Sequence, residues 1–394
     1  DRGRCDPDPN AAACRYLNSS SALVRAPIRI GCAVSRRLSI SPPLNWGAHP
    51  LGPMKLLSRY DVTGRLASGS AGTVFLARDE RDDSEVVAKI FDTTPNGLAP
   101  WFQEMRLAMR LHHPHIVPVR DVGFDAEERV WVLIFPYARG GSLRRAMVVK
   151  KRFETPEIAQ LMCETATALA VAHRQGVVHR DIKPENLVAA ETTGEPPWLV
   201  TDFGVGRFLA RSAIASTVVG SMTYMAPEVL AQEARAACDQ FSLGMMGLEL
   251  RTGTLPTKRS RAQWILEYLR HFDLDGIIAR LIDSDPNRRF PSAATVAYLL
   301  QSDRLGRPFD LTRDSSGTSW LLDDGRLFRL LDHAEPEPVS LRIPRARRFV
   351  NAPWASTVLV ASERRVVAVD PDGSRTLYAA DEPFSTLGAA VSEA

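Results

Sequence analysis

The chain has 394 residues, of which 45% are hydrophobic and 24% charged, and this composition is ordinary for a globular protein with at least one sizeable core. The net charge of +3 is too small to indicate a nucleic-acid-binding protein. No apolar run approaches the length of a membrane-spanning helix, and the five cysteines show no C-x-x-C spacing. These features predict a cytoplasmic protein with free thiols, and they leave its oligomeric state open.

Residues 1–53 contain scattered Pro, Ser, Arg and Cys without a sustained hydrophobic period. Met54 directly precedes a more regular pattern that begins at Leu56. Two interpretations stay open for residues 1–53: an extension that is not native to the protein, or a disordered regulatory arm.

Strand-like alternation begins at Tyr60 and surrounds two glycines, Gly69 and Gly72. Glycines let backbone N–H groups approach a phosphate closely, although an ordinary hairpin gives the same pattern. The apolar run 86–90 then carries one lysine, Lys89, and a lysine inside an apolar strand needs an anionic partner. The two stretches together predict a sheet with one functional lysine.

Helical and strand patterns then follow in turn. Residues 101–111, which include Glu104, indicate a helix, and the apolar run 130–137 indicates a central strand. A long helix is predicted over 156–175, with Gly176 as the residue that ends it.

The most informative stretch is His-Arg-Asp-Ile-Lys-Pro-Glu-Asn at 179–186, followed by Thr-Asp-Phe-Gly at 201–204. Phosphoryl transfer from a nucleotide needs a carboxylate that orients the attacking hydroxyl and accepts its proton, and Asp181 can supply it. It also needs oxygen ligands for magnesium, which Asn186 and Asp202 can supply. Lys183 can offset the charge that develops on the transferred phosphate.

The residue types and spacing in these two motifs resemble the protein kinase family, and the form with Lys183 is similar to its bacterial, eukaryotic-like serine/threonine branch. The segment 220–228, which ends Tyr-Met-Ala-Pro-Glu, resembles the end of that family's activation segment. The resemblance covers roughly residues 58–304. It implies an α+β, two-lobed fold, with a kinase domain at 54–304 made of a small β-rich lobe (58–137) and a larger helical lobe (138–304).

The resemblance also implies the nucleotide site, with ATP and Mg²⁺ as cofactors. Lys89 would bind the α- and β-phosphates and pair with Glu104, while Phe135 takes the gatekeeper position and Ala138 offers backbone hydrogen bonds to adenine. The implied catalytic residues are Lys89, Glu104, Asp181, Lys183 and Asn186. The implied nucleotide-binding residues are Leu66, Gly69, Gly72, Val74, Val87, Lys89, Phe135, Ala138, Val188 and Asp202, and the metal ligands are Asn186 and Asp202.

Two structural roles follow from the same resemblance. Asp239 would hold the backbone of the loop 179–186, and Arg289 would pair with Glu228 in the larger lobe.

Beyond residue 304 the pattern changes to short apolar runs around turn residues. Residues 318–330 predict a hairpin across Asp324-Gly325, and residues 357–370 repeat the shape about 39 residues later. The spacing suits propeller blades, but two units cannot close a propeller. We expect residues 305–394 to form a small β appendage packed on the kinase, and we expect the kinase to fold without it.

The function implied by the resemblance is transfer of the γ-phosphoryl of ATP to serine or threonine hydroxyls of proteins, in bacterial signalling. A pseudokinase scaffold is the alternative. In related kinases an arginine at the position of Arg180 is neutralised by a phosphate on the activation segment. This predicts autophosphorylation at one of three hydroxyls, Ser212, Ser216 or Thr217, with Ser216 and Thr217 favoured, although these hydroxyls could instead be merely solvated.

Overall fold

The computed structural model describes 14 ranges of the chain: 54–69, 72–91, 105–190, 197–203, 223–230, 235–254, 256–313, 318–323, 326–330, 335–342, 348–350, 358–361, 365–370 and 373–379. The chain divides into two compact units. The first comprises Asp1–Met109 with Val119–Tyr137, and the second Arg110–Pro118 with Ala138–Ala394. The predictions for residues 1–53, Glu104, Ser212, Ser216 and Thr217 lie outside the described residues.

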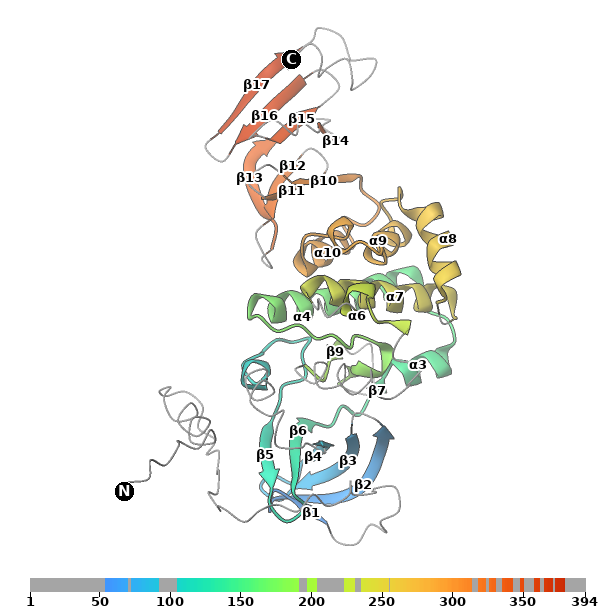
Figure 1. Cartoon of the computed structure of the whole chain (residues 1–394), viewed down its shortest axis with the longest axis vertical. Helices are drawn as coiled ribbons and strands as arrows, with labels where there is room; N and C mark the ends of the chain where they lie inside the picture. The colour runs from blue at the N-terminus through green and yellow to red at the C-terminus, as the bar shows by residue number, and fades with distance from the viewer. Residues whose placement is uncertain are drawn as a thin grey trace, which may run out of the picture. The chain divides into compact units, whose positions relative to one another are not determined.

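The first unit is built on a six-stranded antiparallel sheet with strand order β1-β2-β3-β4-β6-β5 (Figure 1). All of the strands predicted for this part of the chain are present. The apolar run at 130–137 forms β6, which lies between β4 and β5 as a central strand. The strands are β1 (Lys55–Leu56), β2 (Tyr60–Gly69), β3 (Gly72–Asp79), β4 (Glu85–Phe91), β5 (Asp121–Asp125) and β6 (Val130–Pro136).

The two faces of this sheet have different surroundings. Successive side chains of a strand point to opposite faces, so β4 places Val86, Ala88 and Ile90 on one face and Val87 and Lys89 on the other. The first three belong to a buried hydrophobic cluster that also contains Phe75 of β3 and Ile134 of β6. Lys89 therefore lies on the face opposite to this core.

The second unit contains a helical core and a small three-stranded sheet, β7 (Gly141–Ser142), β8 (Leu187–Ala189) and β9 (Trp198–Val200). No helix among the described residues is long and apolar enough to cross a membrane. The helices are α3 (Leu143–Lys150), α4 (Thr155–Arg174), α6 (Pro227–Leu230), α7 (Ala236–Thr252), α8 (Lys258–Tyr268), α9 (Leu274–Leu281) and α10 (Ala293–Leu299), with single 3₁₀ turns at Pro184–Asn186 and Pro286–Arg288.

Helix α7 is the centre of this unit, because every residue from Cys238 to Leu250 is buried. Close packing depends on two of its glycines. A Cβ atom at Gly244 would lie 2.6 Å from Cβ of Leu281 on α9, and one at Gly247 would lie 2.6 Å from Sδ of Met162 on α4. The Cβ of Leu281 is fixed to its helix backbone, so glycine is required at Gly244, where α9 meets α7, whereas at Gly247 the end of the flexible Met162 side chain would have to move.

The C-terminal region forms two four-stranded antiparallel sheets, each with its strands in sequence order (Figure 1). The predicted hairpins are present as β11–β12 and β15–β16, and the expectation of a β-rich C-terminal region is confirmed. The first sheet contains β10 (Phe309–Arg313), β11 (Ser319–Asp323), β12 (Arg326–Leu330) and β13 (Glu337–Arg342), and the second contains β14 (Arg348–Val350), β15 (Val358–Ala361), β16 (Arg365–Asp370) and β17 (Gly373–Ala379).

The first of these sheets shares its core with the helices. Leu321 on β11 and Phe328 and Leu330 on β12 belong to the same buried cluster as the side chains of α4, α7, α9 and α10. On the other side of the sheet, Trp320 packs in a second cluster with Val360 of β15. This packing argues against the expectation that the kinase folds without residues 305–394, because removing them would expose apolar surface of the helical core.

Candidate active site

The loop that carries the predicted catalytic residues begins where α4 ends. The helix starts with a reciprocal capping interaction between Glu154 and Glu157 and ends one residue before the predicted boundary. Gly176 follows with a φ of 74°, a conformation that glycine adopts without strain, and the N–H of Val177 donates a 2.9 Å hydrogen bond back to the carbonyl of Ala172. The chain is thereby turned into the loop 179–186.

Asp239 on α7 holds the backbone of this loop, as predicted. Its carboxylate accepts hydrogen bonds from the N–H groups of His179 (2.8 Å) and Arg180 (2.7 Å), and Nε2 of His173 lies 2.8 Å from the same carboxylate. The aspartate is fully buried. Burial alone would raise its pKa, but the hydrogen bond from His173 and the charges and N–H groups around it hold the pKa of this carboxyl below its usual value.

Asp181 lies between two side chains of its own loop. The ammonium of Lys183 is 2.7 Å and 2.9 Å from its two carboxylate oxygens. The amide nitrogen of Asn186 donates to Oδ2 of Asp181 at 2.9 Å and to the Asp181 carbonyl at 2.7 Å. The structure therefore brings together three of the five predicted catalytic residues, and it fixes the orientation of the carboxylate from two sides.

The pairing of β8 with β9 brings the segment that carries Asp202 beside the loop 179–186. Leu187 is opposite Val200 in the antiparallel register, so the residue before β8, Asn186, lies beside the residues after β9. The N–H of Thr201 donates a 3.0 Å hydrogen bond to the Asn186 carbonyl. Asp202 has a φ of 72°, which is unusual for a residue other than glycine, and such strain is found most often at functional sites.

Asn186 and Asp202 fit a magnesium site. Mg²⁺ is usually held by one or two carboxylate or amide oxygens together with phosphate oxygens and water, so two protein ligands are sufficient. Because Asn186 uses its amide nitrogen to bind Asp181, its oxygen is the atom left to bind a cation. The donor set is therefore of the kind that binds magnesium together with a nucleotide.

In the first unit, four of the predicted nucleotide-binding residues share one face of the sheet. Val74 is opposite Lys89 in the β3–β4 register, and Val87 is opposite Phe135 in the β4–β6 register, so these four side chains lie on the face that carries Lys89. All four are at least partly buried. Lys89 therefore shares one face of the sheet with the apolar side chains of Val74, Val87 and Phe135.

The predicted phosphate loop is the β2–β3 hairpin. Gly69 and Gly72 are the last paired residues before the turn, and Gly72 has a φ of 117°, which strongly favours glycine. Leu66 on β2 is nearly half exposed.

Two further predicted residues lie in the second unit. The carbonyl of Ala138 accepts a hydrogen bond from the N–H of Gly141 (3.2 Å), and Val188 lies half-buried at the centre of β8.

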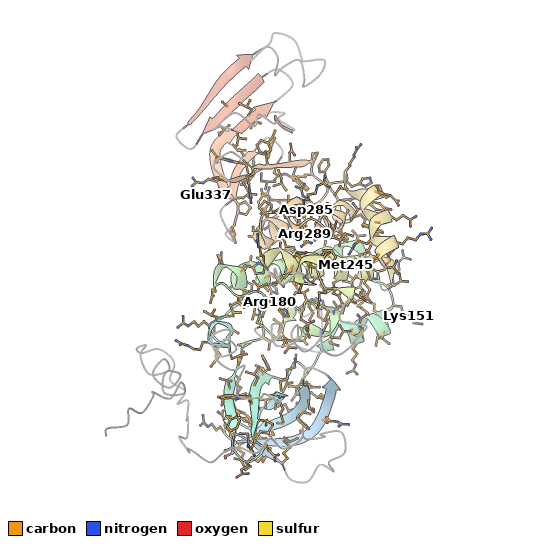
Figure 2. The ribbon with its side chains drawn as sticks, in the orientation of Figure 1. Lys151, Arg180, Met245, Asp285, Arg289 and Glu337 are labelled. Carbon is orange, nitrogen blue, oxygen red and sulfur yellow. The ribbon has the colours of Figure 1, made fainter. Side chains whose placement is uncertain are left out.

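The pair formed by Arg289 and Glu228 was also predicted correctly. The guanidinium of Arg289 is fully buried and binds both carboxylate oxygens of Glu228, at 2.5 Å and 3.0 Å, just after the start of α6. Figure 2 labels Arg289 among the side chains of the helical core, together with Met245 of α7. This pair fixes the end of the activation segment to the helical core.

Sequence reasoning missed two groups of residues around the loop 179–186, which is called the catalytic loop below because it carries the predicted catalytic residues. His173 on α4 is buried against Asp239, and the available signal was a histidine on the apolar face of a helix. Arg144 on α3 binds Glu185 of the catalytic loop together with Tyr224 and Glu249. These three partners are 41, 80 and 105 residues away in the sequence, and no local pattern signals their proximity.

The known proteins that resemble this chain in sequence include several that are named serine/threonine-protein kinases. The serine/threonine-protein kinase PknJ of Mycobacterium tuberculosis is 31% identical over 275 residues, which cover 64% of this chain and 46% of PknJ. The probable serine/threonine-protein kinase pknA2 of Bifidobacterium longum is 31% identical over 263 residues, or 64% of this chain and 33% of pknA2. PkaB of Streptomyces coelicolor is 34% identical over 51% of this chain and 50% of PkaB. The chain thus spans between a third and a half of the length of these relatives.

The fold is similar to that of a solved kinase domain. A double mutant of the PknI kinase domain of Mycobacterium tuberculosis matches with a TM-score of 0.53 and 23% identity, covering 65% of this chain and 99% of that one. The protein kinase domain profile matches residues 60–298, and it includes every predicted catalytic residue. The chain belongs to the protein kinase domain family.

Proposed function

We propose that the chain is a bacterial serine/threonine protein kinase that transfers the γ-phosphoryl group of ATP to a hydroxyl of a protein substrate. The observation that carries this proposal is the fixed geometry around Asp181, whose carboxylate is bound by both Lys183 and Asn186. The names of the bacterial relatives support the same activity.

In the proposed reaction, Asp181 orients the attacking hydroxyl and accepts its proton. Asp181 and Lys183 are each about one-sixth exposed, so the carboxylate is accessible to a substrate yet already held in place. The ammonium of Lys183, next to Asp181, is suited to neutralise charge on the phosphoryl group during transfer. Because both charges are fixed before the substrate binds, little reorganisation is needed in the transition state.

The residues that would bind the nucleotide are those that the resemblance to kinases implies. Lys89 would bind the α- and β-phosphates with Glu104 as its partner, and the backbone at Gly69 and Gly72 would approach the phosphates closely. Adenine would contact the side chains of Leu66, Val74, Val87, Phe135 and Val188 and the backbone of Ala138. Magnesium, held by Asn186 and Asp202, would neutralise the phosphate charge.

Regulation is proposed to occur through the activation segment. Autophosphorylation at Ser216 or Thr217 would add negative charge that can bind Arg180, which precedes the catalytic Asp181.

The cytoplasm is the compartment that we propose, because the substrate ATP and a reducing environment are both present there. A scaffold without activity has no observation in its favour, since Lys89, Asp181 and Asp202 are all present.

The proposal is tested by incubating the full chain with radiolabelled ATP and Mg²⁺ and a generic basic protein substrate. We expect label on serine or threonine of the substrate, and transfer that is at least about 100-fold slower when Asp181 is replaced by Asn. If the chain binds ATP but labels neither itself nor any substrate, the kinase assignment is wrong.

A further inference from the structure

Arg144, the second residue of α3, connects three elements that are far apart in the sequence. Its Nε donates a 2.7 Å hydrogen bond to the carboxylate of Glu185 in the catalytic loop. Its Nη1 donates to Glu249 on α7 at 2.7 Å, and its Nη2 donates to the hydroxyl of Tyr224 at 2.6 Å. One guanidinium therefore uses all three of its nitrogens on three separate segments of the second unit.

The inner part of the cluster is buried, whereas the side chains of Arg144 and Glu185 are 29% and 45% exposed, and the charges of the cluster are complementary. Glu249 and Tyr224 are each almost fully buried. The hydroxyl of Tyr224 donates to Glu249 while it accepts from Arg144. Burial and the hydrogen bond to Glu249 both raise the pKa of Tyr224, so the hydroxyl keeps its proton. Burial alone would lower the pKa of Arg144, but hydrogen bonds to Glu249 and Glu185 hold it above its ordinary value.

Glu185 connects this cluster to the catalytic groups. It is the middle residue of the 3₁₀ turn Pro184–Asn186, which follows directly after Lys183. Lys183 and Asn186 both bind Asp181 directly. The N–H of Asn186 donates a 2.9 Å hydrogen bond to the carbonyl of Lys183, so the backbone closes into one short turn around Glu185. Holding the side chain of Glu185 therefore restrains the backbone from which the side chains of Lys183 and Asn186 extend.

Tyr224 connects the cluster to the end of the activation segment. It lies three residues before Pro227, the first residue of α6, and the next residue of that helix is the Glu228 that Arg289 holds. Arg144 thus joins the catalytic loop to the segment that Arg289 fixes from the other side.

We propose that Arg144 is a positioning residue for phosphoryl transfer, which holds the turn bearing Lys183 and Asn186 in a fixed position relative to Tyr224. The inference rests on the kinase activity proposed above. Arg144 does not itself contact Asp181 in the described structure, so it acts through Glu185. A guanidinium carries its donors on three nitrogens in one fixed plane, so it reaches three separated acceptors, whereas a lysine carries its three donors on one nitrogen and would reach fewer of them.

The experiment measures kcat, KM for ATP and the melting temperature of the full chain and of Arg144→Gln, Arg144→Lys, Glu185→Gln and the double variant Arg144→Gln/Glu185→Gln. We expect Arg144→Gln to lower kcat about tenfold with KM for ATP changed less than about twofold, because the nucleotide contacts stay intact. Arg144→Lys should recover part of the loss. Glu185→Gln, whose side chain is nearly half exposed, should lower kcat in the same way with little change in melting temperature.

The double variant should be no slower than Arg144→Gln alone, because both substitutions break the same connection. Arg145→Gln, at the next position of α3 and outside this cluster, is the matched control and should have the wild-type kcat. If Arg144→Gln does not fold, Glu185→Gln alone decides the question.

Three outcomes contradict the inference: a folded Arg144→Gln or Glu185→Gln with the wild-type kcat, losses in the double variant that multiply, or a loss of kcat that disappears at a temperature where variant and wild type are equally folded. A wild-type chain that transfers no phosphoryl group overturns the proposed function itself, which is a different result from an active wild type with unaffected variants.

Discussion

The hydroxyl of Tyr298 on α10 donates a 3.0 Å hydrogen bond to Asp323, the last residue of β11. Asp323 is almost fully buried and is also bound by Arg304, so a polar contact that is buried on the side of the C-terminal sheet joins this sheet to the helical core. The ring of Tyr298 lies edge-on to Phe328 with a centroid separation of 5.2 Å. The first C-terminal sheet is therefore continuous with the core of the kinase.

Phe328→Ala should destabilise the helical core and the first C-terminal sheet together. Phe328 is buried in the cluster shared with α4 and α10, so the substitution should lower the free energy of unfolding by about 3 kcal/mol. Arg329 lies next to Phe328 on β12 and forms an exposed ion pair with Glu337 on β13. Arg329→Ala removes this pair and should lower the free energy of unfolding by about 0.5 kcal/mol or less. Denaturant titration followed by circular dichroism gives both values. A separate, early transition in Phe328→Ala, with the main one unchanged, would mean that the sheet is an independent appendage.

Asp239→Asn should loosen the catalytic loop. An amide cannot accept from His173 and from two backbone N–H groups as the carboxylate does, and one of its own N–H groups would face a donor. We expect a loss of at least about 3 kcal/mol in unfolding free energy and a lower kcat. Thermal unfolding and steady-state kinetics measure these effects. Asp285→Asn is the control, since this exposed residue begins a turn where Asn serves as well as Asp. Equal stability of both variants would refute the anchoring role.

Asp181→Asn and Asp202→Ala should separate catalysis from metal binding. Asp181→Asn should reduce phosphoryl transfer at least about 100-fold and leave ATP affinity unchanged, because the carboxylate acts on the hydroxyl. Asp202→Ala should weaken ATP binding in the presence of Mg²⁺ but not in its absence, because the metal contact is lost. Calorimetric titrations with ATP, with and without Mg²⁺, test this difference. If Asp202→Ala binds Mg²⁺-ATP as tightly as the wild type, Asp202 is not a metal ligand.

Phosphorylation of the activation segment is expected after incubation with ATP and Mg²⁺. Peptide mass spectrometry should find phosphate between Phe208 and Val219, and the variant Ser216→Ala/Thr217→Ala should be slower than the wild type. Ser212→Ala, in the same segment, is the matched control. An active enzyme whose segment stays unmodified, and whose double variant is equally fast, would exclude this mode of activation.

Much of the candidate site could be predicted from the sequence, because its chemistry is concentrated in short stretches. Asp181, Lys183 and Asn186 lie within six residues, and the structure shows them in direct contact. The apolar run 86–90 is equally local, and it predicted the strand that carries Lys89. The resemblance to kinases supplied the longer-range pairs formed by Asp239 and Arg289, which alternation and spacing do not reveal.

Only the tertiary structure decided which faces are covered and which distant side chains meet. Every residue of β11 is buried, and its consecutive apolar residues are compatible with burial on both sides, but the sequence does not say that helices cover one side and β15 and β16 the other. The cluster around Arg144 joins residues up to 105 positions apart. The local sequence pattern indicates whether a side chain is buried. The residues that it contacts depend on how whole helices and strands pack, and that geometry exists only in the folded chain.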